Sequence, residues 1–373
     1  MIKGFKIRIY PNKIQREQIE KHIGCCRFIW NYMLNLQNEN YKSGNTYISK
    51  YDMMKKITPM KKLEEYSWLN EVSINSLRII CMDLDKCFKS FFNKQNGYPK
   101  FKSKKKSKSV YPVRSDRFYF KNDKHMQVPI LGIVKYKTDF EIPTRKHKFS
   151  NVRLSKEFDK YYISFGMECE NQTQKLNDYS MGIDLGIKNL ATVSCGDEIL
   201  VFHNINKSSK MKKLNKRLRC VQKSISRKYE VNKFTKTNNI MEEEEKLRKI
   251  YKKISNIRNN YIHQISHELV QLLPKRVVME DLNVRGMAKN KYLAKSIMEQ
   301  EFNKFITYMK YKCENNNIEF VQANRIYPSS KMCSKCKEIK KDLTLNDRVY
   351  KCNCGLEIDR DLNAAINLMN YIV

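Results

Sequence analysis

The C-terminal segment constrains the fold more than any other part of the chain. Its cysteines have the spacing of a metal site, and they are Cys333, Cys336, Cys352 and Cys354. A Cys-x-x-Cys pair followed by a second close pair is a strong signal for a tetrahedral zinc site. The run Asp359-Arg360-Asp361 follows directly and opens an apolar helical pattern. A zinc site that leads into a helix start would hold one acidic side chain with little freedom.

Length and charge bound the class of protein. The sequence has 373 residues, enough for two or three domains, and a formal charge of +34 from 73 Lys and Arg against 39 Asp and Glu. Such a charge favours a polyanionic partner, because each neutralised phosphate releases counterions. A membrane surface would also attract it, but the sequence has no long apolar run and no secretory signal. We therefore expect a cytoplasmic protein that acts on nucleic acid and has no membrane partner.

The N-terminal half combines helical and strand-like patterns. Phe5, Ile7 and Ile9 alternate with polar residues, which predicts a short strand that Pro11 ends. A helical period covers residues 11–96, with an interruption expected at Gly24. Short strand-like runs then follow at residues 118–120, 128–134, 152–154 and 161–165. Their spacing and turn residues predict a small β-barrel or sandwich.

A basic loop joins the helical region to these strands. Residues 97–106 mix aromatic side chains with lysines, and the simplest interpretation is a solvated linker without a binding role. The total charge favours a loop that contacts phosphates instead. The candidate nucleic-acid-binding residues are Lys100, Lys102, Lys104, Lys105 and Arg325, and the basic segments 100–108 and 207–223 are candidates for backbone contacts.

The sequence pattern of the C-terminal half predicts three antiparallel strands, followed by a helix, a strand, a helix, a strand and a helix. The strand-like runs are 181–186, 190–194, 199–203, 277–280 and 318–321. A basic helical stretch, 207–260, is interrupted near residues 235–239, and a further helix is expected over 293–313. The basic stretch 207–260 contains an acidic block, 242–245, that faces lysine and arginine at i,i+4. This pattern indicates a solvated, salt-bridged helix. The order of elements predicts a ribonuclease-H-like fold.

Two carboxylates lie on the apolar strands of this half. The strand period places Asp184 on one face with Gly182 and Gly186, and the glycines would leave room for a phosphodiester backbone. Glu280 ends a buried strand, where open α/β sheets bind their ligands. For each acid alone, a hydrogen bond to backbone at the strand end explains it as well as catalysis does.

The third acid lies at the predicted helix start. Asp361 has a structural explanation as a helix N-cap, and Asp359 is an alternative candidate, although the position favours Asp361. Three acids that converge in one fold predict a site for two Mg²⁺ ions, which would activate water and stabilise the leaving oxygen in phosphodiester cleavage. The predicted catalytic and metal-binding residues are Asp184, Glu280 and Asp361.

Motifs along nearly the whole chain resemble the TnpB family of transposon-encoded, RNA-guided nucleases, which are ancestral to type V CRISPR effectors. The matching segments are Phe5-Lys6-Ile7-Arg8-Ile9-Tyr10-Pro11, Gly97-Tyr98-Pro99-Lys100-Phe101-Lys102-Ser103-Lys104, Gly182-Ile183-Asp184-Leu185-Gly186, Glu280-Asp281-Leu282-Asn283-Val284-Arg285-Gly286-Met287, Tyr327-Pro328-Ser329-Ser330-Lys331 and Asp359-Arg360-Asp361-Leu362-Asn363-Ala364-Ala365. One departure is the second cysteine pair: the family usually has Cys-x-x-Cys, whereas this chain has Cys352-Asn353-Cys354. The contraction is expected to strain the zinc site or weaken its binding.

The resemblance implies a multidomain α+β organisation. A wedge-like β-barrel would comprise residues 1–10 and 97–172, interrupted by a helical recognition domain over 11–96. A RuvC-like nuclease domain would cover 178–373, with a basic helical insertion at 205–260 and a zinc ribbon at 326–358. Asp184, Glu280 and Asp361 would be the catalytic triad.

The resemblance also implies the activity and the partners. The protein would bind a guide RNA derived from the transposon end, recognise a short motif in double-stranded DNA, pair guide with target and cut both DNA strands. A compact chain of this length has a radius of gyration of ~21 Å, whereas a heteroduplex of about 20 bp reaches ~70 Å. We therefore expect a monomer or homodimer in which folded RNA supplies part of the scaffold.

Two alternatives stay open at this point. A DDE-type transposase would also carry three acids on a ribonuclease-H-like fold, but it would act without RNA. A nuclease-silent, RNA-guided repressor would bind DNA only, and it would be expected to lose acids from the triad. Co-purification of a discrete RNA separates the first alternative from an RNA-guided nuclease, and metal-dependent cleavage separates the second.

Overall fold

The computed structural model describes residues 2–105, 107–138, 148–169, 174–340, 342–344 and 347–372. The chain divides into two compact units, Met1–Glu170 and Asn171–Val373. Each unit has a hydrophobic core of its own. Parts of the predicted barrel (139–147 and 170–172), of the basic loop (Lys106) and of the zinc ribbon (Lys341, Leu345 and Asn346) lie outside the described residues. The finer division into four domains stays a prediction.

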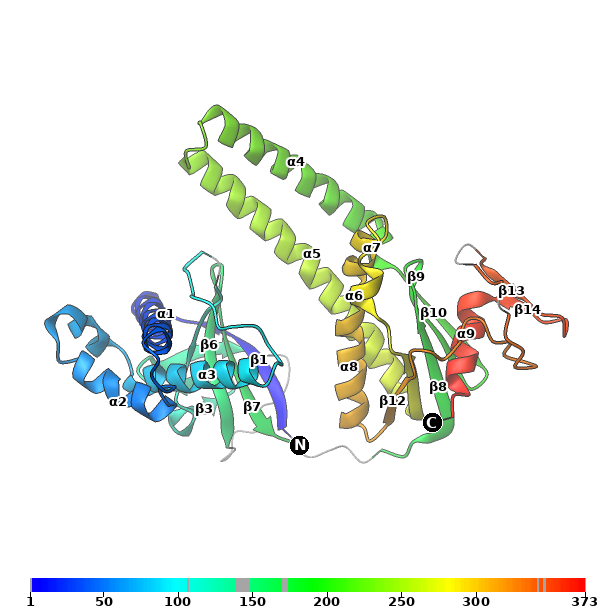
Figure 1. Ribbon diagram of the computed structural model, residues 1–373, viewed down its shortest axis with the longest axis horizontal. Coiled ribbons are helices and arrows are strands. Elements are labelled where there is room, and N and C mark those ends of the chain that lie inside the picture. The colour runs from blue at the N-terminus through cyan, green and yellow to red at the C-terminus, as the bar shows by residue number, and fades with distance from the viewer. Residues whose placement is uncertain are drawn as a thin grey trace. The chain divides into compact units, whose positions relative to one another are not determined.

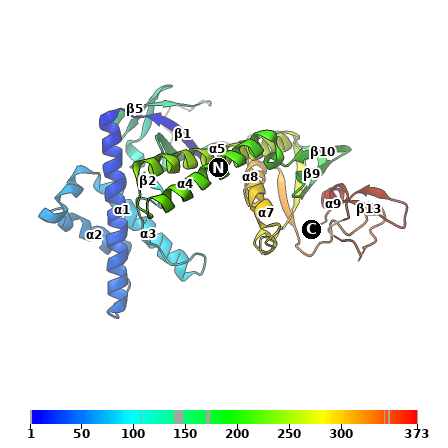
Figure 2. The same cartoon turned by 90° about the horizontal axis from the view of Figure 1, so that it is seen from above.

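The first unit begins with a strand and a helical region. Its elements are β1 (Ile2–Tyr10), α1 (Lys13–Lys42), α2 (Lys50–Met60), the 3₁₀ helix η1 (Glu64–Glu71) and α3 (Ile74–Phe92). A capping box between Asn12 and Gln15 starts α1. The predicted interruption at Gly24 is wrong, because α1 is one continuous helix of 30 residues (Figure 2). A glycine costs only about 1 kcal/mol in a helix, and the buried Ile23, Cys25 and Cys26 around it outweigh that cost.

Seven antiparallel strands complete the first unit. With β1 they are β2 (Ser109–Pro112), β3 (Tyr119–Asn122), β4 (His125–Val128), β5 (Gly132–Lys137), β6 (Phe149–Glu157) and β7 (Lys160–Glu168), and a short 3₁₀ helix η2 (Ser115–Arg117) precedes β3. The order across the sheet is β2-β6-β7-β1-β5-β4-β3. The run at 128–134 is a hairpin rather than one strand, because Ile130 and Gly132 adopt positive φ angles of 71° and 72°.

The prediction of a barrel is wrong in one respect: the sheet does not close. Its two edge strands, β2 and β3, are not hydrogen-bonded to each other in the described residues. Both strands have only four residues, and helices cover the β2 edge instead. The hydroxyl of Ser76 on α3 donates to the carbonyl of Pro112 at 2.7 Å. A proline tolerates this position because an edge strand needs fewer ladder donors.

The second unit is built on a five-stranded mixed sheet. Its strands are β8 (Asn177–Leu185), β9 (Asn189–Cys195), β10 (Glu198–His203), β11 (Pro274–Glu280) and β12 (Glu319–Ala323), in the order β10-β9-β8-β11-β12. The first three strands form the predicted antiparallel meander, with Gly196 at positive φ in its second turn. Strands β8, β11 and β12 are parallel, so their carboxyl ends meet at one edge of the sheet.

The helices of the second unit follow the predicted order with one difference. They are α4 (Ser209–Val231), α5 (Asn238–Gln271), α6 (Val284–Met287), α7 (Ala294–Gln300), α8 (Phe302–Asn315) and α9 (Arg360–Met369), and two short strands, β13 (Val349–Lys351) and β14 (Glu357–Asp359), precede α9. The single helix expected over 293–313 is broken at Glu301, whose φ of 54° is left-handed. Helices α4 and α5 form a long antiparallel hairpin (Figure 1). Glu244 and Glu245 pair with Arg248 and Lys249 at i,i+4 as predicted, whereas Glu243 pairs with Lys246 at i,i+3 and with Lys228 of α4.

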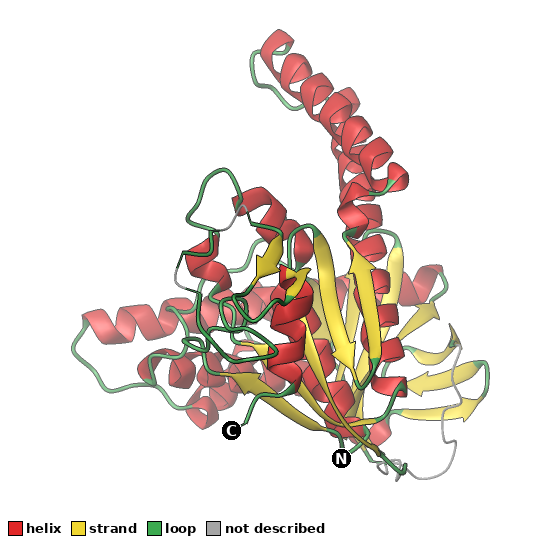
Figure 3. Cartoon of the chain, turned by 90° about the vertical axis from the view of Figure 1, so that its right-hand side faces the viewer, coloured by secondary structure: helices red, strands yellow, loops and turns green. Residues whose placement is uncertain are grey.

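The two faces of the sheet carry different helices. Helices α5 and α8 cover one face and α9 lies on the other (Figures 1 and 3). Met181, Ile183 and Leu185 of β8 pack in the core toward α5 and α8, as the strand period predicts. The alternate residues, Gly182 and Asp184, therefore face α9.

No helix in the described part of the chain is both long and apolar enough to cross a membrane.

Candidate metal centres

A glycine determines where α9 sits. A Cβ atom on Gly182 would lie 2.0 Å from the carbonyl oxygen of Ala365 and 2.3 Å from the nitrogen of Met369. The backbone of α9 therefore rests directly on β8. The prediction that Gly182 leaves room for a phosphodiester is wrong, because the helix occupies that room. The same contact brings the start of α9 to the face that carries Asp184.

The three predicted carboxylates come from three elements of this face. Asp184 is the penultimate residue of β8, and Glu280 is the last residue of the parallel neighbour β11. In β11, Val277 and Met279 pack toward α5 and α8, so Val278 and Glu280 face α9. Asp361 lies in the first turn of α9, with Oδ2 3.9 Å from the position of a Cβ on Gly186. All three side chains are partly buried.

The cap of α9 is Asp359, not Asp361. The Oδ1 atom of Asp359 accepts hydrogen bonds from the backbone nitrogens of Asp361 at 2.9 Å and Leu362 at 3.2 Å. This satisfies two of the free N–H groups at the helix start. The structural explanation for Asp361 is therefore removed, and its carboxylate is free for another role. Asp359 is exposed and serves the backbone instead.

Electrostatics couples these carboxylates. Burial raises the pKa of Asp184 well above its usual value, and the negative charges of Asp361 and Glu280 raise it further. Burial also raises the pKa of Glu280, with a second contribution from Asp281. Arg360 partly offsets this repulsion, and its Nη2 lies 3.8 Å from Oδ1 of Asp361. A buried carboxyl whose pKa is raised by the negative charges of two neighbouring acids is poised to bind cations.

The carboxylates do not form a cluster for a single ion. Within the described residues, only the four cysteines gather three or more metal-ligating side chains closely enough to share one ion. Two-ion sites differ, because their ions lie about 3.5–4 Å apart and each carboxylate needs to reach only one or both of them. With Mg–O distances of about 2.1 Å, ligand oxygens on opposite sides of such a pair stand up to about 8 Å apart. A two-ion site therefore does not require the three acids to lie as close together as the four cysteines do.

The four cysteines form a compact metal-binding cluster. The sulfurs of Cys333 and Cys354 are 3.7 Å apart, those of Cys336 and Cys352 are 3.5 Å apart, and all four lie within 4.8 Å of one another. Tetrahedral zinc with Zn–S bonds of about 2.3 Å requires sulfurs about 3.8 Å apart. The contracted second pair therefore still reaches the site, helped by Gly355 at a φ of +85°.

Backbone hydrogen bonds lower the pKa of Cys333, the first of the four cysteines. Burial raises the pKa of the Cys333 thiol, but hydrogen bonds from the backbone N–H groups of Cys336 and Lys335 outweigh burial and lower the pKa to about 7. The nitrogen of Cys336 lies 3.5 Å from the Cys333 sulfur. A lower pKa favours the thiolate, which is the form that binds metals.

Two buried asparagines connect the cysteine cluster to α9, and sequence reasoning missed both. Asn363 donates to the carbonyl of Met332 at 2.7 Å and accepts from the nitrogen of Ser334 at 2.9 Å. Asn367, one turn later, donates to the carbonyls of Ser329 at 2.9 Å and Met332 at 2.6 Å. Their i,i+4 spacing in an otherwise apolar helix was the signal that could have revealed them. Helix α9 thus contacts β8 on one side and the cysteine loop on another.

The predicted nucleic-acid-binding residues have different surroundings. Lys100, Lys104 and Lys105 are exposed. Lys102 is partly buried, with Nζ 3.4 Å from the ring centroid of Trp30, and burial lowers its pKa. Arg325 forms an ion pair with Asp281 at 2.6 Å and follows β12, at the same sheet edge as Glu280. Lys102 therefore holds the loop against α1, whereas the other three lysines remain accessible.

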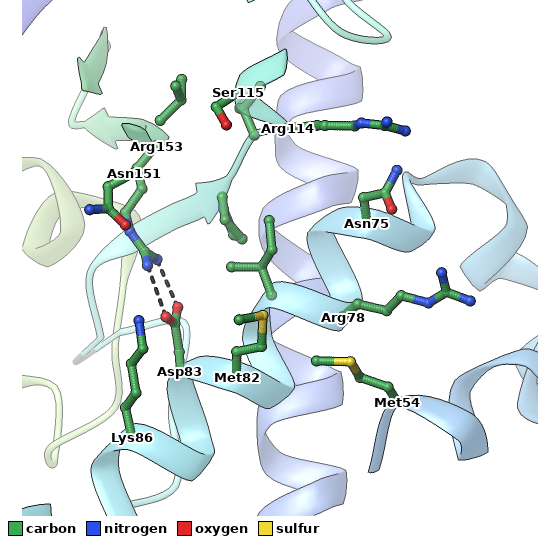
Figure 4. Close-up of a pocket in the computed structure, with 14 residues that line it drawn as sticks. Met54, Asn75, Arg78, Met82, Asp83, Lys86, Arg114, Ser115, Asn151 and Arg153 are labelled. Carbon is green, nitrogen blue, oxygen red and sulfur yellow. Dashed lines mark hydrogen bonds and ion pairs between the residues drawn. The ribbon is translucent and has the colours of Figure 1, made fainter. Parts of the chain in front are cut away.

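The first unit contains a basic pocket of about 520 Å³ that sequence reasoning did not identify (Figure 4). It lies between α3 and the strands β2 and β6. Arg153 and Asp83 form a bidentate ion pair in this pocket, with the Nη1 and Nη2 atoms of Arg153 at 2.8 and 2.9 Å from the carboxylate oxygens of Asp83. Figure 4 shows Asn75, Arg78 and Arg114 on the side opposite this pair. Within the described part of the chain, Arg78 has no carboxylate partner, so its charge is available to a ligand.

Three family models match the chain. A model described as "Helix-turn-helix domain" matches residues 1–46, one described as "Probable transposase" matches 164–291, and one described as "Cas12f1-like, TNB domain" matches 302–368. The first description does not fit the local structure, since residues 2–42 form one strand and one continuous helix. The third match contains all four cysteines and the start of α9.

Relatives and solved structures match over almost the full length. A protein of Streptomyces pristinaespiralis named "Putative RNA-guided DNA endonuclease" is 28% identical over 98% of this chain and 88% of its own. The Escherichia coli protein "Putative RNA-guided DNA endonuclease InsQ" is 28% identical over 99% of this chain and 92% of its own. A structure titled "Cryo-EM structure of the Cas12f1-sgRNA-target DNA complex" aligns with a TM-score of 0.62 and 12% identity, covering 99% of both chains.

These matches define the class first: the chain is a multidomain α+β protein with the fold of Cas12f1. More narrowly, it belongs to the TnpB family, also described as OrfB_IS605, as the sequence motifs predicted.

Proposed function

We propose that this protein is an RNA-guided DNA endonuclease whose second unit is a ribonuclease-H-like, RuvC-type nuclease. The observation that carries the proposal is the convergence of Asp184, Glu280 and Asp361 on the α9 face of the mixed sheet, with coupled charges. The full-length relatives named as RNA-guided DNA endonucleases support the same activity. The partners would be a guide RNA derived from the transposon end and a double-stranded DNA target, with the protein acting in the cytoplasm as a monomer or homodimer.

The three carboxylates would hold two Mg²⁺ ions. Bound there, the ions would supply the activation of water and the neutralisation of charge that phosphodiester hydrolysis needs. The chain itself fixes the ligands: β8 and β11 are rigid parallel neighbours, and α9 is held against β8 at Gly182. Arg360 lies beside Asp361, where it orients that carboxylate and limits repulsion before ions bind. The four cysteines would hold Zn²⁺, and the role of that ion would be structural because all four positions are filled by protein.

The test of the function is purification with and without RNA. The complex purified from cells that express the chain beside its transposon end should contain one discrete noncoding RNA and should cut matching DNA only with a divalent metal. Removal of the RNA should abolish cutting. Protein that cuts after ribonuclease treatment would favour a DDE-type transposase. Stable, guide-dependent DNA binding without cutting would favour the nuclease-silent repressor.

The basic pocket of the first unit is our candidate for the site that reads the short DNA motif. Arginine pairs with the O6 and N7 atoms of guanine, and asparagine with the N6 and N7 atoms of adenine. Arg78 and Asn75 lie one turn apart on α3, so both would reach neighbouring base edges. Arg78→Ala should weaken cutting at the preferred motif by about 1–3 kcal/mol, roughly 5- to 150-fold, and relax motif preference at one position.

The measurement is cleavage of a plasmid library with a randomised motif. Lys86→Ala is the matched control, since it removes a cation from the same helix and pocket. A phosphate contact at Lys86 would weaken cutting equally across motifs and leave the preference unchanged. Equal motif profiles for Arg78→Ala and wild type would contradict the assignment.

The asparagines of α9 should control metal retention at the cysteines. Asn367→Ala would remove the side-chain donor to the carbonyl of Ser329 and leave the carbonyl of Met332 with Asn363 alone, at a cost of about 1–3 kcal/mol. We expect weaker binding of Co²⁺, read from its thiolate absorption, by about 5- to 150-fold. Asn370→Ala is the control, because, among the residues that the structure describes, the side chain of the exposed Asn370 bonds only within its own helix. Equal Co²⁺ affinity in both variants would show that α9 does not support the cysteine loop.

A further inference from the structure

An aromatic cluster in the first unit extends from the buried Phe88 of the core to the protein surface. Five rings from the end of α3, the loop after it and the loop after α1 form what we term the aromatic platform: Tyr47, Phe88, Phe91, Phe92 and Tyr98. Several of the ring pairs meet edge to face, with centroids 5.6 Å apart for Tyr47 and Phe88, 5.6 Å for Phe88 and Tyr98, and 5.1 Å for Phe91 and Tyr98. Such contacts stabilise each pair by about 0.5–1.5 kcal/mol beyond burial.

Hydrogen bonds hold the two tyrosines of the platform in place. The hydroxyl of Tyr98 donates to Oδ1 of Asn38 on α1 at 2.5 Å, and the hydroxyl of Tyr47 donates to Asp85 at 3.1 Å. The indole nitrogen of Trp30 donates to the carbonyl of Lys100 at 3.0 Å and fixes the loop that carries Tyr98. Ring positions are therefore set before any ligand arrives, which reduces the entropy lost on binding.

The platform is nevertheless open on one side. Phe88 is 3% exposed, but Phe92 is 60%, Tyr98 is 45% and Tyr47 is 39% exposed. Tyr41, at the end of α1, is 82% exposed and lies near enough to Tyr98 to raise its pKa, after the larger effect of burial. A group of fixed, exposed rings is expensive to leave in water and indicates a binding surface.

The charge around the rings identifies the occupant. The exposed lysines Lys42, Lys94 and Lys100 lie within two residues of Tyr41, Phe92 and Tyr98 in the sequence. The acids nearby are Glu39, and Asp85, which is buried and already paired with Lys89 at 3.0 Å. A second copy of the chain, docked by two-fold symmetry, would bring like lysines together and is disfavoured. Nucleic acid suits both features, because bases stack on rings and phosphates bind lysines.

We propose that the aromatic platform binds unpaired bases of an RNA. The proposal rests on the proposed function, which supplies an RNA partner, and it adds a site separate from the nuclease centre and from the basic pocket. Bases in a continuous duplex present only their edges, so the rings select single-stranded or looped-out nucleotides. Stacking on one aromatic side chain contributes about 1–3 kcal/mol per base, with little dependence on sequence.

The test uses the full-length protein freed of nucleic acid and a labelled 15-nucleotide oligoadenylate as the probe. Phe92→Ala should weaken binding by about 5- to 20-fold in fluorescence anisotropy, and Phe92→Trp should restore it. Binding of a 15-bp RNA duplex should be unchanged. Tyr119→Ala is the matched control, because Tyr119 is a 53% exposed aromatic residue in another part of the same unit. Unfolding temperatures of all variants confirm that they fold.

Two results would overturn the proposal. Equal oligoadenylate affinity for wild type and Phe92→Ala would show that the rings do not stack on bases. A dimer in sedimentation that Phe92→Ala converts to monomer, with RNA affinity unchanged, would assign the platform to a second copy. This assay needs neither guide nor cleavage, so its failure is distinguishable from failure of the nuclease assignment.

Discussion

Asp184→Asn is expected to abolish DNA cleavage and, in the same protein, to raise the unfolding temperature measured without metal. The loss of cleavage should be on the order of 10³-fold or more, because the variant removes one ligand of the ions and one charge that acts in the transition state. Guide-dependent DNA binding should be retained. Unchanged cutting would refute the role of Asp184.

The gain in stability follows from the raised pKa of Asp184. A carboxyl whose folded pKa exceeds its unfolded pKa favours folding when it is protonated, and that contribution is lost as pH rises through the unfolded and folded values. At pH 8 without metal, the ionised Asp184 repels Asp361 and Glu280, and the asparagine does not. We expect a gain of about 1 kcal/mol, or about 2–4 °C for a unit of this size. The gain should disappear at pH 4, and a gain of equal size at both pH values would contradict this explanation.

Gly182→Ala should have the largest effect on stability of any glycine substitution in the second unit. The added methyl would meet the backbone of α9 at 2.0 and 2.3 Å, and backbone atoms cannot rotate away. We expect a loss of about 3 kcal/mol, together with loss of cleavage, because α9 must move and it carries Asp361. Thermal unfolding and cleavage of the same preparation measure the two effects.

Gly24→Ala is the control for this substitution. Nothing lies within 4 Å of a Cβ at Gly24, which sits in the middle of α1. Alanine should therefore stabilise that helix by up to about 1 kcal/mol. If Gly182→Ala left both stability and cleavage unchanged, α9 would not be held where the structure places it.

The sequence was most informative where a pattern is local. Period-2 alternation correctly assigned Ile183 and Leu185 to one face of β8 and Asp184 to the other, because side-chain direction along a strand depends only on sequence. The cysteine spacing likewise predicted a compact cluster, since the ligands are close in the chain.

The sequence predictions failed where packing between segments that are distant in the sequence determines the structure. Gly182 looked like space for a ligand, but only the packing of α9 from the far end of the chain shows what fills it. Gly24 and Glu301 show the same limit in helices. Helix α1 continues through Gly24 because its neighbours are buried, whereas the left-handed Glu301 ends α7 within a segment whose hydrophobic period is helical. Local sequence also could not predict whether the first sheet closes into a barrel. Its edge strand β2 is covered by the distant helix α3, whose Ser76 bonds to Pro112.

The central claim is that Asp184, Glu280 and Asp361 together hold two divalent ions. Anomalous X-ray diffraction from crystals of the RNA-bound protein soaked in Mn²⁺ tests it most directly. We predict two manganese peaks about 4 Å apart among these three side chains, and neither peak in the Asp184→Asn variant. Manganese bound elsewhere in the second unit, with these carboxylates free of metal, would contradict the claim.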